Sequence, residues 1–313
     1  MKKIVRGISR FPLMVLPVFL IGSALFCLLS SQFPDLAPAK IVTLFNCERN
    51  IVYKESQDYS LKMDIYGISR ELTASPLLIY IHGGGWYSGS KNTGAGQQDI
   101  AEFVKHGYTV AALDYRLAPR YKYPAQLEDV RCAIEFLRAN AERWGIDKNR
   151  VGVFGDSAGG HLAAMVGLTG ADDPLQAGLA GESIRAVIDI YGPTDLALVL
   201  EKDKSDHIEH VFGTSQKDSE AIRTASPINH VTANAPPFLI IHGDSDSIVL
   251  PVQSQLLYER LVDCGVAATL LQVKNCDHRF TAVGGEITPT RSEISHIMIE
   301  FFDRYLKDVQ VTT

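Results

Sequence analysis

The chain has 313 residues, of which 46% are hydrophobic and 21% are charged, and its formal net charge at pH 7 is −6. This length and apolar content are sufficient for one large domain with a substantial core. Acidic residues outnumber basic ones and no stripe of lysine and arginine occurs, so nucleic acid is not an expected partner.

The first 34 residues differ in character from the rest. The stretch 11–34 contains no charged residue. Four basic residues precede it, which are Lys2, Lys3, Arg6 and Arg10. A basic start followed by an apolar run is typical of an export signal, and this run is about as long as the ~20 residues that span a bilayer. We interpret 1–34 as an uncleaved signal anchor that holds an exported domain at the membrane. A cleaved signal peptide, giving a secreted or periplasmic protein, is the alternative.

Residues 35–50 are interpreted as a linker and 51–313 as one folded domain. At its start, 51–53 and 61–66 alternate apolar and polar residues, as in a hairpin with one buried face. Later apolar runs are typical of strands buried on both faces of a parallel sheet. These runs are 76–81, 108–113, 151–154, 186–191, 238–241 and 269–273.

Helical patterns lie between the apolar runs. Apolar residues recur at every third or fourth position in 126–144, 254–262 and 294–306. Alternation of strand and helix predicts an α/β fold with a mostly parallel, doubly wound sheet and an antiparallel start. The stretch 192–237 breaks the alternation and is long for a loop. We interpret it as a small cap over an active site, and a solvated surface excursion is the alternative.

Beyond the N-terminal segment the cysteines fit no metal-binding spacing, and a chain of this size does not need disulfides. Cys132 lies on the apolar side of a helical pattern and is expected in the core. Cys264 and Cys276 flank a predicted strand, and the sequence leaves open whether they pair.

The most informative stretch is 155–159, which reads Gly-Asp-Ser-Ala-Gly. It follows the apolar run 151–154 and precedes a helix of small residues, 161–166. This strand–turn–helix context is typical of a nucleophile elbow, in which a serine occupies a strained turn between small neighbours. We predict that Ser157 is a nucleophile. The alternative is a glycine-rich turn that packs a helix against a strand.

A serine hydroxyl needs a base, and the base needs an orienting carboxylate. Where a nucleophile elbow carries the serine, the acid and then the histidine follow it in the chain. Asp246 and His278 each follow a predicted strand, so both are expected at the carboxyl edge of the sheet. We predict Asp246 as the acid and His278 as the base. Asp244 is the alternative acid and His242 the alternative base.

The other polar residues near these motifs are expected to have different roles. His161 follows the elbow on a helix and is expected to be structural. Asp156 is expected to face away from the serine on so tight a turn. Surface or cap positions are expected for the histidines without supporting context, which are His106, His207, His210 and His230.

A glycine cluster supplies the remaining requirement. Residues 82–86 read His-Gly-Gly-Gly-Trp and follow the predicted strand 76–81. Consecutive glycines let backbone amides approach a ligand without obstruction from a Cβ atom. The amides of Gly84, Gly85 and Ala158 are therefore the candidate oxyanion hole. This chemistry requires neither a metal nor an organic cofactor.

Together these motifs resemble the α/β-hydrolase esterases, near hormone-sensitive lipase and the bacterial feruloyl and acetyl-xylan esterase-like proteins. The resemblance covers about residues 50–307 and includes Asp-Tyr-Arg-Leu-Ala-Pro at 114–119. It implies an α/β-hydrolase fold with a small cap, and triad roles for Ser157, Asp246 and His278. Arg279 departs from the family, where small residues or glycine are common at this position.

The resemblance also implies a serine carboxylesterase that hydrolyses short-acyl carboxylic esters through an acyl-enzyme. The expected substrate is a small-molecule ester or an ester linked to a polysaccharide. Amide or peptide hydrolysis by the same machinery, as in arylformamidases and prolyl-peptidase relatives, is one alternative. A non-catalytic binding protein built on the hydrolase fold is the other.

Overall fold

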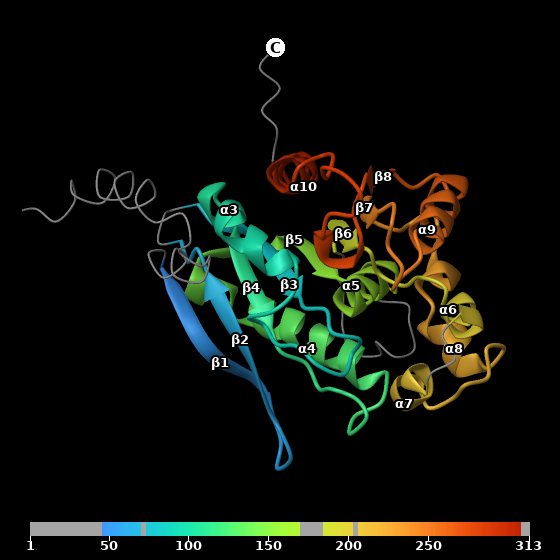
Figure 1. Ribbon diagram of the computed structural model, residues 1–313. Helices are drawn as coiled ribbons and strands as arrows, with labels where there is room; N and C mark the ends of the chain where they lie inside the picture. Colours follow the sequence, from blue (N-terminus) through green and yellow to red (C-terminus); the bar gives the residue numbers. More distant parts are fainter. Residues whose placement is uncertain (1–45, 70–72, 170–183, 203–205, 308–313) are drawn as a thin grey trace, which may run out of the picture.

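One sheet has the strand order β1-β2-β4-β3-β5-β6-β7-β8 (Figure 1). The computed structural model describes residues 46–69, 73–169, 184–202 and 206–307. β1 pairs antiparallel with β2, β2 pairs antiparallel with β4, and all later pairs are parallel. The strands are β1 (Cys47–Glu55), β2 (Ser60–Tyr66), β3 (Ser75–Ile81), β4 (Thr109–Leu113), β5 (Ile146–Asp156), β6 (Ala186–Ile190), β7 (Phe238–Gly243) and β8 (Ala268–Val273).

Helices cover both faces of the sheet, so the predicted doubly wound architecture is confirmed (Figure 1). One face packs against α4 (Ala125–Ala139), α5 (Ala158–Leu168) and α9 (Val252–Asp263). The other face packs against α3 (Ile100–Lys105) and α10 (Arg291–Leu306). Short 3₁₀ turns complete these connections at η2 (Gly96–Asp99), η3 (Ala141–Trp144) and η6 (His278–Phe280).

The stretch between β6 and β7 forms short helices instead of a strand. They are α6 (Leu196–Lys202), α7 (His207–Phe212), α8 (Glu220–Ala225) and the 3₁₀ turn η5 (Pro227–His230). In Figure 1 they lie together at one side of the molecule, below α9.

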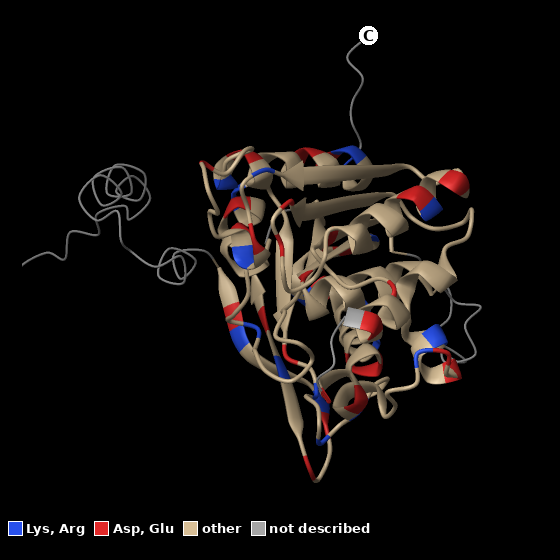
Figure 2. Ribbon diagram, turned by 45° about the vertical axis from the view of Figure 1, so that its right-hand side comes forward, with Lys and Arg blue, Asp and Glu red and all other residues tan. Residues whose placement is uncertain are grey.

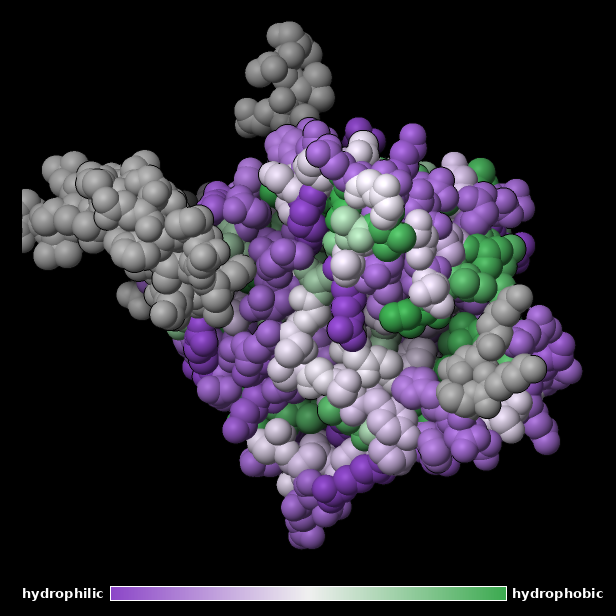
Figure 3. All heavy atoms as spheres, viewed as in Figure 1, coloured by the Kyte–Doolittle hydropathy of each residue, from purple (hydrophilic) through white to green (hydrophobic). Residues whose placement is uncertain are grey.

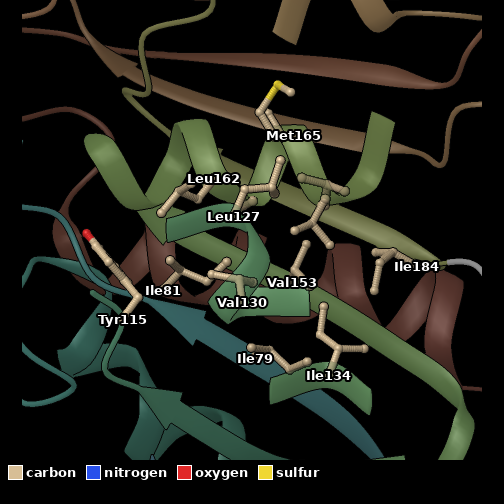
Figure 4. Close-up of a cluster of buried hydrophobic side chains, with 14 of the residues drawn as sticks. Ile79, Ile81, Tyr115, Leu127, Val130, Ile134, Val153, Leu162, Met165 and Ile184 are labelled. Carbon is tan, nitrogen blue, oxygen red and sulfur yellow. The ribbon is translucent and has the colours of Figure 1, made fainter. Parts of the chain in front are cut away.

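The larger core cluster holds the elbow helix against the sheet. Buried side chains of β3, β5, α4 and α5 meet in this cluster (Figure 4). Ile79 and Ile81 come from β3, Leu127 and Val130 from α4, and Leu162 from α5. This apolar packing fixes the distance between α5 and the end of β3. The candidate site lies where β3 ends and α5 begins.

The structure corrects the predicted boundary between the linker 35–50 and the domain. β1 begins at Cys47, so residues 47–50 belong to the sheet. Two register shifts in the pairing of β1 with β2 obscure the alternation in the sequence. At the first shift, Asn50 has a φ of +56° and its amide donates to Asp64 Oδ1 at 2.7 Å.

The prediction that the hairpin turns its polar residues outward is wrong for Asp64, which is 1% exposed. The Asn50 amide of β1 and the Tyr66 hydroxyl both donate to this buried carboxylate. Lys91 Nζ lies 3.5 Å from the buried carboxylate.

The predicted segment 1–34 is outside the described residues and stays a prediction. Within the described ranges, no helix combines the length and the apolar character needed to cross a bilayer.

Cys264 and Cys276 are both free thiols. Cys276 is buried in the core cluster that includes α3 and α10, whereas Cys264 packs against the cluster on the opposite face of the sheet. The sheet therefore separates them, and they do not form a disulfide. Cys132 is half-buried and packs against the larger cluster, as predicted for a core position.

Charged residues of both signs are interspersed on the helices and loops around the sheet (Figure 2). Asp189 is an exception, because it lies in β6 with no exposed surface. Its Oδ1 accepts a hydrogen bond from the Gly192 amide at 2.8 Å. Its Oδ2 has no hydrogen-bond partner among the described residues. Burial raises the pKa of Asp189 to about 6, although the Gly192 amide and the nearby His242 act in the opposite direction.

We predict that Asp189 makes the protein less stable as the pH rises from about 4 to 6. The folded-state pKa of about 6 exceeds the ordinary value of 3.8, so the native state binds the proton more tightly than the unfolded chain. Asp189→Asn should remove this contribution. Relative to wild type, its free energy of unfolding should rise between pH 4 and pH 7 by on the order of 3 kcal/mol. Urea titrations of both proteins at these pH values measure the difference, and a difference that does not change with pH would contradict the prediction.

Candidate active site

Ser157 occupies a sharp turn between the end of β5 and the start of α5, which is the predicted strand–turn–helix context. Its backbone has φ +56° and ψ −120°, a conformation that residues with side chains rarely adopt. Its amide donates to the Ile190 carbonyl at 2.8 Å, and its carbonyl accepts from the His161 amide at 3.0 Å. Gly159 has to be glycine, because a Cβ atom there would lie 2.0 Å from the Ile81 carbonyl oxygen.

The structure brings Ser157, Asp246 and His278 together. They lie in the segments that follow β5, β7 and β8, respectively. His278 Nε2 lies 3.1 Å from Ser157 Oγ, and His278 Nδ1 lies 2.6 Å from Asp246 Oδ2. A carboxylate oxygen only accepts, so Nδ1 carries the hydrogen in this contact. Nε2 of the neutral ring is then free to accept the proton of the Ser157 hydroxyl. The geometry is that of an activated serine nucleophile.

Asp246 is 3% exposed, and four donors converge on its carboxylate. Oδ1 accepts from the amides of Ile248 at 2.9 Å and Val249 at 3.0 Å. Oδ2 faces His278 and also lies 3.3 Å from His242 Nε2. Burial disfavours the ionised form, but the hydrogen bonds from His242, His278 and the amide of Ile248 outweigh it and hold the pKa of Asp246 well below its usual range. Asp246 is therefore a stable anion beside the imidazole.

His242, the alternative base, is buried and contacts the site through Asp246. Its Nε2 lies 2.8 Å from the Val249 carbonyl, so this nitrogen donates. Its Nδ1 lies 2.6 Å from Ser254 Oγ and accepts the hydroxyl hydrogen. Reasoning from the sequence missed this supporting contact with the acid. The available signal is the histidine at the end of β7, four positions before Asp246.

The two other carboxylates near these motifs make different contacts. Asp244 is exposed and accepts from Ser245 Oγ at 2.9 Å and from the Cys276 amide at 3.3 Å, so it braces the turn. Asp156 is buried and accepts from the Tyr80 hydroxyl at 2.7 Å. Asp246 is thus the carboxylate that meets the His278 ring.

A strained loop carries His278. The next two residues, Arg279 and Phe280, have φ values of +71° and +60°. The left-handed conformation at Arg279 is one that glycine adopts more readily than arginine. The ring of Tyr191, with a φ of +44°, packs against the imidazole at a centroid distance of 4.4 Å. Phe280 packs edge-on against Tyr191 at 5.4 Å and extends the aromatic contacts around the imidazole.

The glycine cluster lies directly beside the elbow. A Cβ atom on Gly83 would lie 3.3 Å from Ser157 Cβ and 2.6 Å from Asp156 Oδ2. Gly85 and Ala158 line a cavity together with Ser157, and Gly84 immediately precedes Gly85 in the turn after β3. In the described part of the chain, the amides of Gly84, Gly85 and Ala158 have no hydrogen-bond acceptor. They remain available for a ligand oxygen, as an oxyanion hole requires.

The cavity beside Ser157 has a volume of about 430 Å³, and no aspartate, glutamate, lysine or arginine lines it. The stretch after β6 contributes Pro193, Leu198, Val199, His207 and Ile208, and the loop after Asp246 contributes Ser247, Ile248, Val249 and Leu250. The lining by His207 was not predicted, because only tertiary packing brings α7 to this position. Ile248 is 70% exposed at this loop.

On the face drawn in Figure 3 most atoms are hydrophilic, and hydrophobic patches gather on the side of α9. Val252 and Val262 of α9 are among the exposed large apolar side chains.

Across the described ranges, no group of three or more histidine, cysteine, aspartate and glutamate side chains is arranged to hold a metal ion.

Comparison with known proteins identifies similar chains. The BD-FAE family model matches residues 63–261. Esterase LipC of Mycobacterium tuberculosis is 36% identical over 231 residues, which cover 71% of this chain and 57% of LipC. Esterase LipQ of the same organism is 32% identical over 213 residues, covering 66% of this chain and 50% of LipQ. The matches therefore span little more than half the length of these relatives.

Two solved structures are similar over most of the described fold. Est2, a thermophilic esterase of Thermogutta terrifontis solved with propionate bound, is 25% identical, with a TM-score of 0.68 over 82% of this chain and 94% of Est2. An acetyl ester-xyloside bifunctional hydrolase of Caldicellulosiruptor lactoaceticus is 25% identical, with a TM-score of 0.66 over 82% of this chain and 95% of that protein. The predicted resemblance is confirmed: the chain belongs to the BD-FAE family and has the α/β-hydrolase fold.

Proposed function

We propose that this protein is a serine carboxylesterase that hydrolyses short-acyl esters through an acyl-enzyme on Ser157. One observation carries the proposal: an unbroken hydrogen-bond chain runs from Ser157 Oγ through His278 to the ionised Asp246. Hydrolysis of esters is supported by the similarity to LipC, LipQ and Est2, each of which is named an esterase. The amides beside Ser157 add the second requirement of acyl transfer, a site for negative charge.

In the first half of the reaction Ser157 Oγ attacks the acyl carbon while its proton moves to His278 Nε2. The carbonyl oxygen becomes an oxyanion and accepts hydrogen bonds from the amides of Gly84, Gly85 and Ala158. Asp246 stabilises the imidazolium that forms. When the tetrahedral species collapses, the bond to the alcohol oxygen breaks, and His278 donates its proton to that oxygen. The alcohol leaves, and the acyl group remains on Ser157.

In the second half a water molecule replaces the alcohol. His278 Nε2 accepts a proton from the water as the water oxygen attacks the acyl carbon. The same amides stabilise the second oxyanion. Its collapse breaks the bond to Ser157 Oγ, which recovers its proton from His278. The products are a carboxylic acid and the free enzyme.

The uncharged cavity is assigned to the acyl group. It adjoins Ser157, and its walls are largely aliphatic. Burial of each methylene of an acyl chain there stabilises the complex by about 0.8 kcal/mol. A carboxylate on the acyl chain would lose hydration without meeting a lysine or arginine, because neither residue type lines the cavity.

We predict that a fluorophosphonate probe labels Ser157 stoichiometrically. Nucleophilic attack on phosphorus uses the same activated hydroxyl, so Ser157→Ala should abolish labelling and esterase activity together. Ser247→Ala is the matched control, because Ser247 lines the same cavity but has no base beside it in the described structure. Intact-protein mass spectrometry measures the adduct. Absence of labelling in folded wild type would overturn the proposed function.

We predict that Asp246→Asn lowers kcat by on the order of 10⁴, because an amide no longer fixes the His278 tautomer. Asp244→Asn is the control, and its kcat should stay within about threefold of wild type, since Asp244 is exposed and only braces a turn. Steady-state hydrolysis of 4-nitrophenyl butyrate, with unfolding curves to confirm that both variants fold, measures the effect. The reverse ranking of the two variants would identify Asp244 as the acid instead.

We predict that 4-nitrophenyl butyrate is hydrolysed with a kcat/KM at least about 10² higher than the monoester of 4-nitrophenol and succinic acid. The two acyl groups have similar lengths and differ in a terminal carboxylate. Leu198→Arg introduces a cation into the cavity wall and should narrow the difference. Equal turnover of the two esters would exclude this cavity as the acyl site. A preference for palmitoyl over butyryl esters would contradict the short-acyl assignment.

A further inference from the structure

The turn that follows β3 has positive φ values at three successive residues. Gly84, Gly85 and Trp86 have φ values of +119°, +63° and +62°. The first two are glycines, which adopt this conformation readily. Trp86 is a bulky residue in the left-handed region, which is a conformation that persists only where the surroundings enforce it. The amide of Gly85 belongs to the proposed oxyanion hole and is adjacent in the chain to Trp86.

A specific contact holds Trp86. Its side chain is 3% exposed, and its Nε1–H donates to Nδ1 of His161 at 3.2 Å. The indole packs edge-on against the His161 ring at 5.1 Å and against Phe212 of α7 at 5.1 Å. The Trp86 carbonyl accepts from the Ala118 amide at 2.9 Å. The hydrogen bond to His161 is the directional one among the side-chain contacts, so it defines the orientation of the indole.

His161 links this indole to two other parts of the site. It lies on α5, and its amide donates to the carbonyl of Ser157 at 3.0 Å. Its Nε2 lies 2.8 Å from the carbonyl of Ala225, the last residue of α8. A carbonyl only accepts, so Nε2 carries the hydrogen and Nδ1 is left to accept from Trp86. Burial lowers the pKa of His161 to about 4, so the neutral ring persists at physiological pH.

We propose that Trp86 is a positioning residue of the oxyanion loop, the turn 83–86 that carries the amides of Gly84 and Gly85. Its hydrogen bond to His161 maintains this loop in its conformation. The hydrogen bond from His161 to the Ala225 carbonyl couples the loop to the helices after β6. The inference rests on the proposed function and deepens it. It differs from a packing role in one respect. The indole N–H, and not the volume of the ring, should determine how well the Gly85 amide stabilises an oxyanion.

The experiment separates the N–H from the ring. Trp86→Phe keeps an aromatic ring and removes the donor, and it should lower kcat about 10-fold, because misplacing an oxyanion donor weakens binding of the transition state. Trp86 also lines the cavity assigned to the acyl group, so KM is compared in His161→Phe, where it should stay within about twofold. The affinity for a trifluoromethyl ketone, whose hemiketal oxyanion occupies the same hole, should fall by the same factor as kcat/KM. His161→Phe should reproduce these losses. His161→Gln should restore near wild-type kcat, because an amide both accepts and donates.

A matched control tests whether the effect belongs to this bond. His230 Nε2 lies 2.8 Å from the carbonyl of Thr224, the neighbour of Ala225 in α8. His230→Phe therefore removes an equivalent bond at the same helix end without contacting Trp86, and kcat should not change. The double variant Trp86→Phe/His161→Phe should lose no more activity than either single variant, because both remove the same interaction.

The outcomes are distinguishable. If folded wild type hydrolyses no ester and takes up no fluorophosphonate, the proposed function fails. If wild type is active and both Trp86→Phe and His161→Phe retain wild-type kcat, this inference fails. Losses that multiply in the double variant, or an equal loss in His230→Phe, would also overturn it. If Trp86→Phe does not fold, the comparison of His161→Phe with His161→Gln tests the same bond.

Discussion

The distance between α5 and the end of β3 is the constraint on which the rest of the site depends. Gly159 lets the first turn of the helix approach the Ile81 carbonyl so closely that a single methyl group would clash. β3 ends at Ile81, and the glycine cluster begins two residues later. One backbone contact thus sets the position of Ser157 and the position of the amides beside it. The apolar packing of α4 and α5 on β3 and β5 maintains that contact.

The buried titratable groups around the site differ in their charge. Asp246 receives four donors and stays ionised, which suits the role proposed for it beside an imidazolium. His161 is buried between a donor and a carbonyl and stays neutral, which suits a group that positions a neighbour. Asp189 has an oxygen without a partner among the described residues, and burial favours its protonated form. Burial thus favours the neutral form of each group, and among the three only Asp246 has hydrogen bonds that outweigh it.

Local features of the sequence were sufficient to predict the sheet strands, the elbow and the order of Ser157, Asp246 and His278. These depend on short apolar runs, on glycines and on polar residues at strand ends, which are visible in a few neighbouring residues. The start of β1, the burial of Asp64 and the helix α3 were not predictable in this way. Register shifts hide the alternation in β1, the buried Asp64 finds Asn50 and Lys91 only in the folded chain, and the six residues of α3 are too few for a periodic pattern.

The residues that contact Asp246, His278 and the cavity were missed because their contacts exist only in the folded chain. His242 meets Asp246, Tyr191 packs on His278, and His207 lines the cavity only because distant segments pack together. His161 was expected to be structural, and its bonds to Trp86 and Ala225 give that expectation a specific form. The choice of Asp246 over Asp244 follows from a tertiary contact that residue order does not reveal.

Direct detection of an acyl-enzyme tests the central claim. Wild type is mixed with excess 4-nitrophenyl butyrate, quenched in acid within milliseconds, digested and analysed by mass spectrometry. We expect a burst of about one equivalent of 4-nitrophenol per enzyme and a butyryl group on the peptide that contains Ser157. Steady turnover without a burst, with no acyl group on Ser157 at any quench time and the butyryl group found on another residue, would contradict nucleophilic catalysis by this serine.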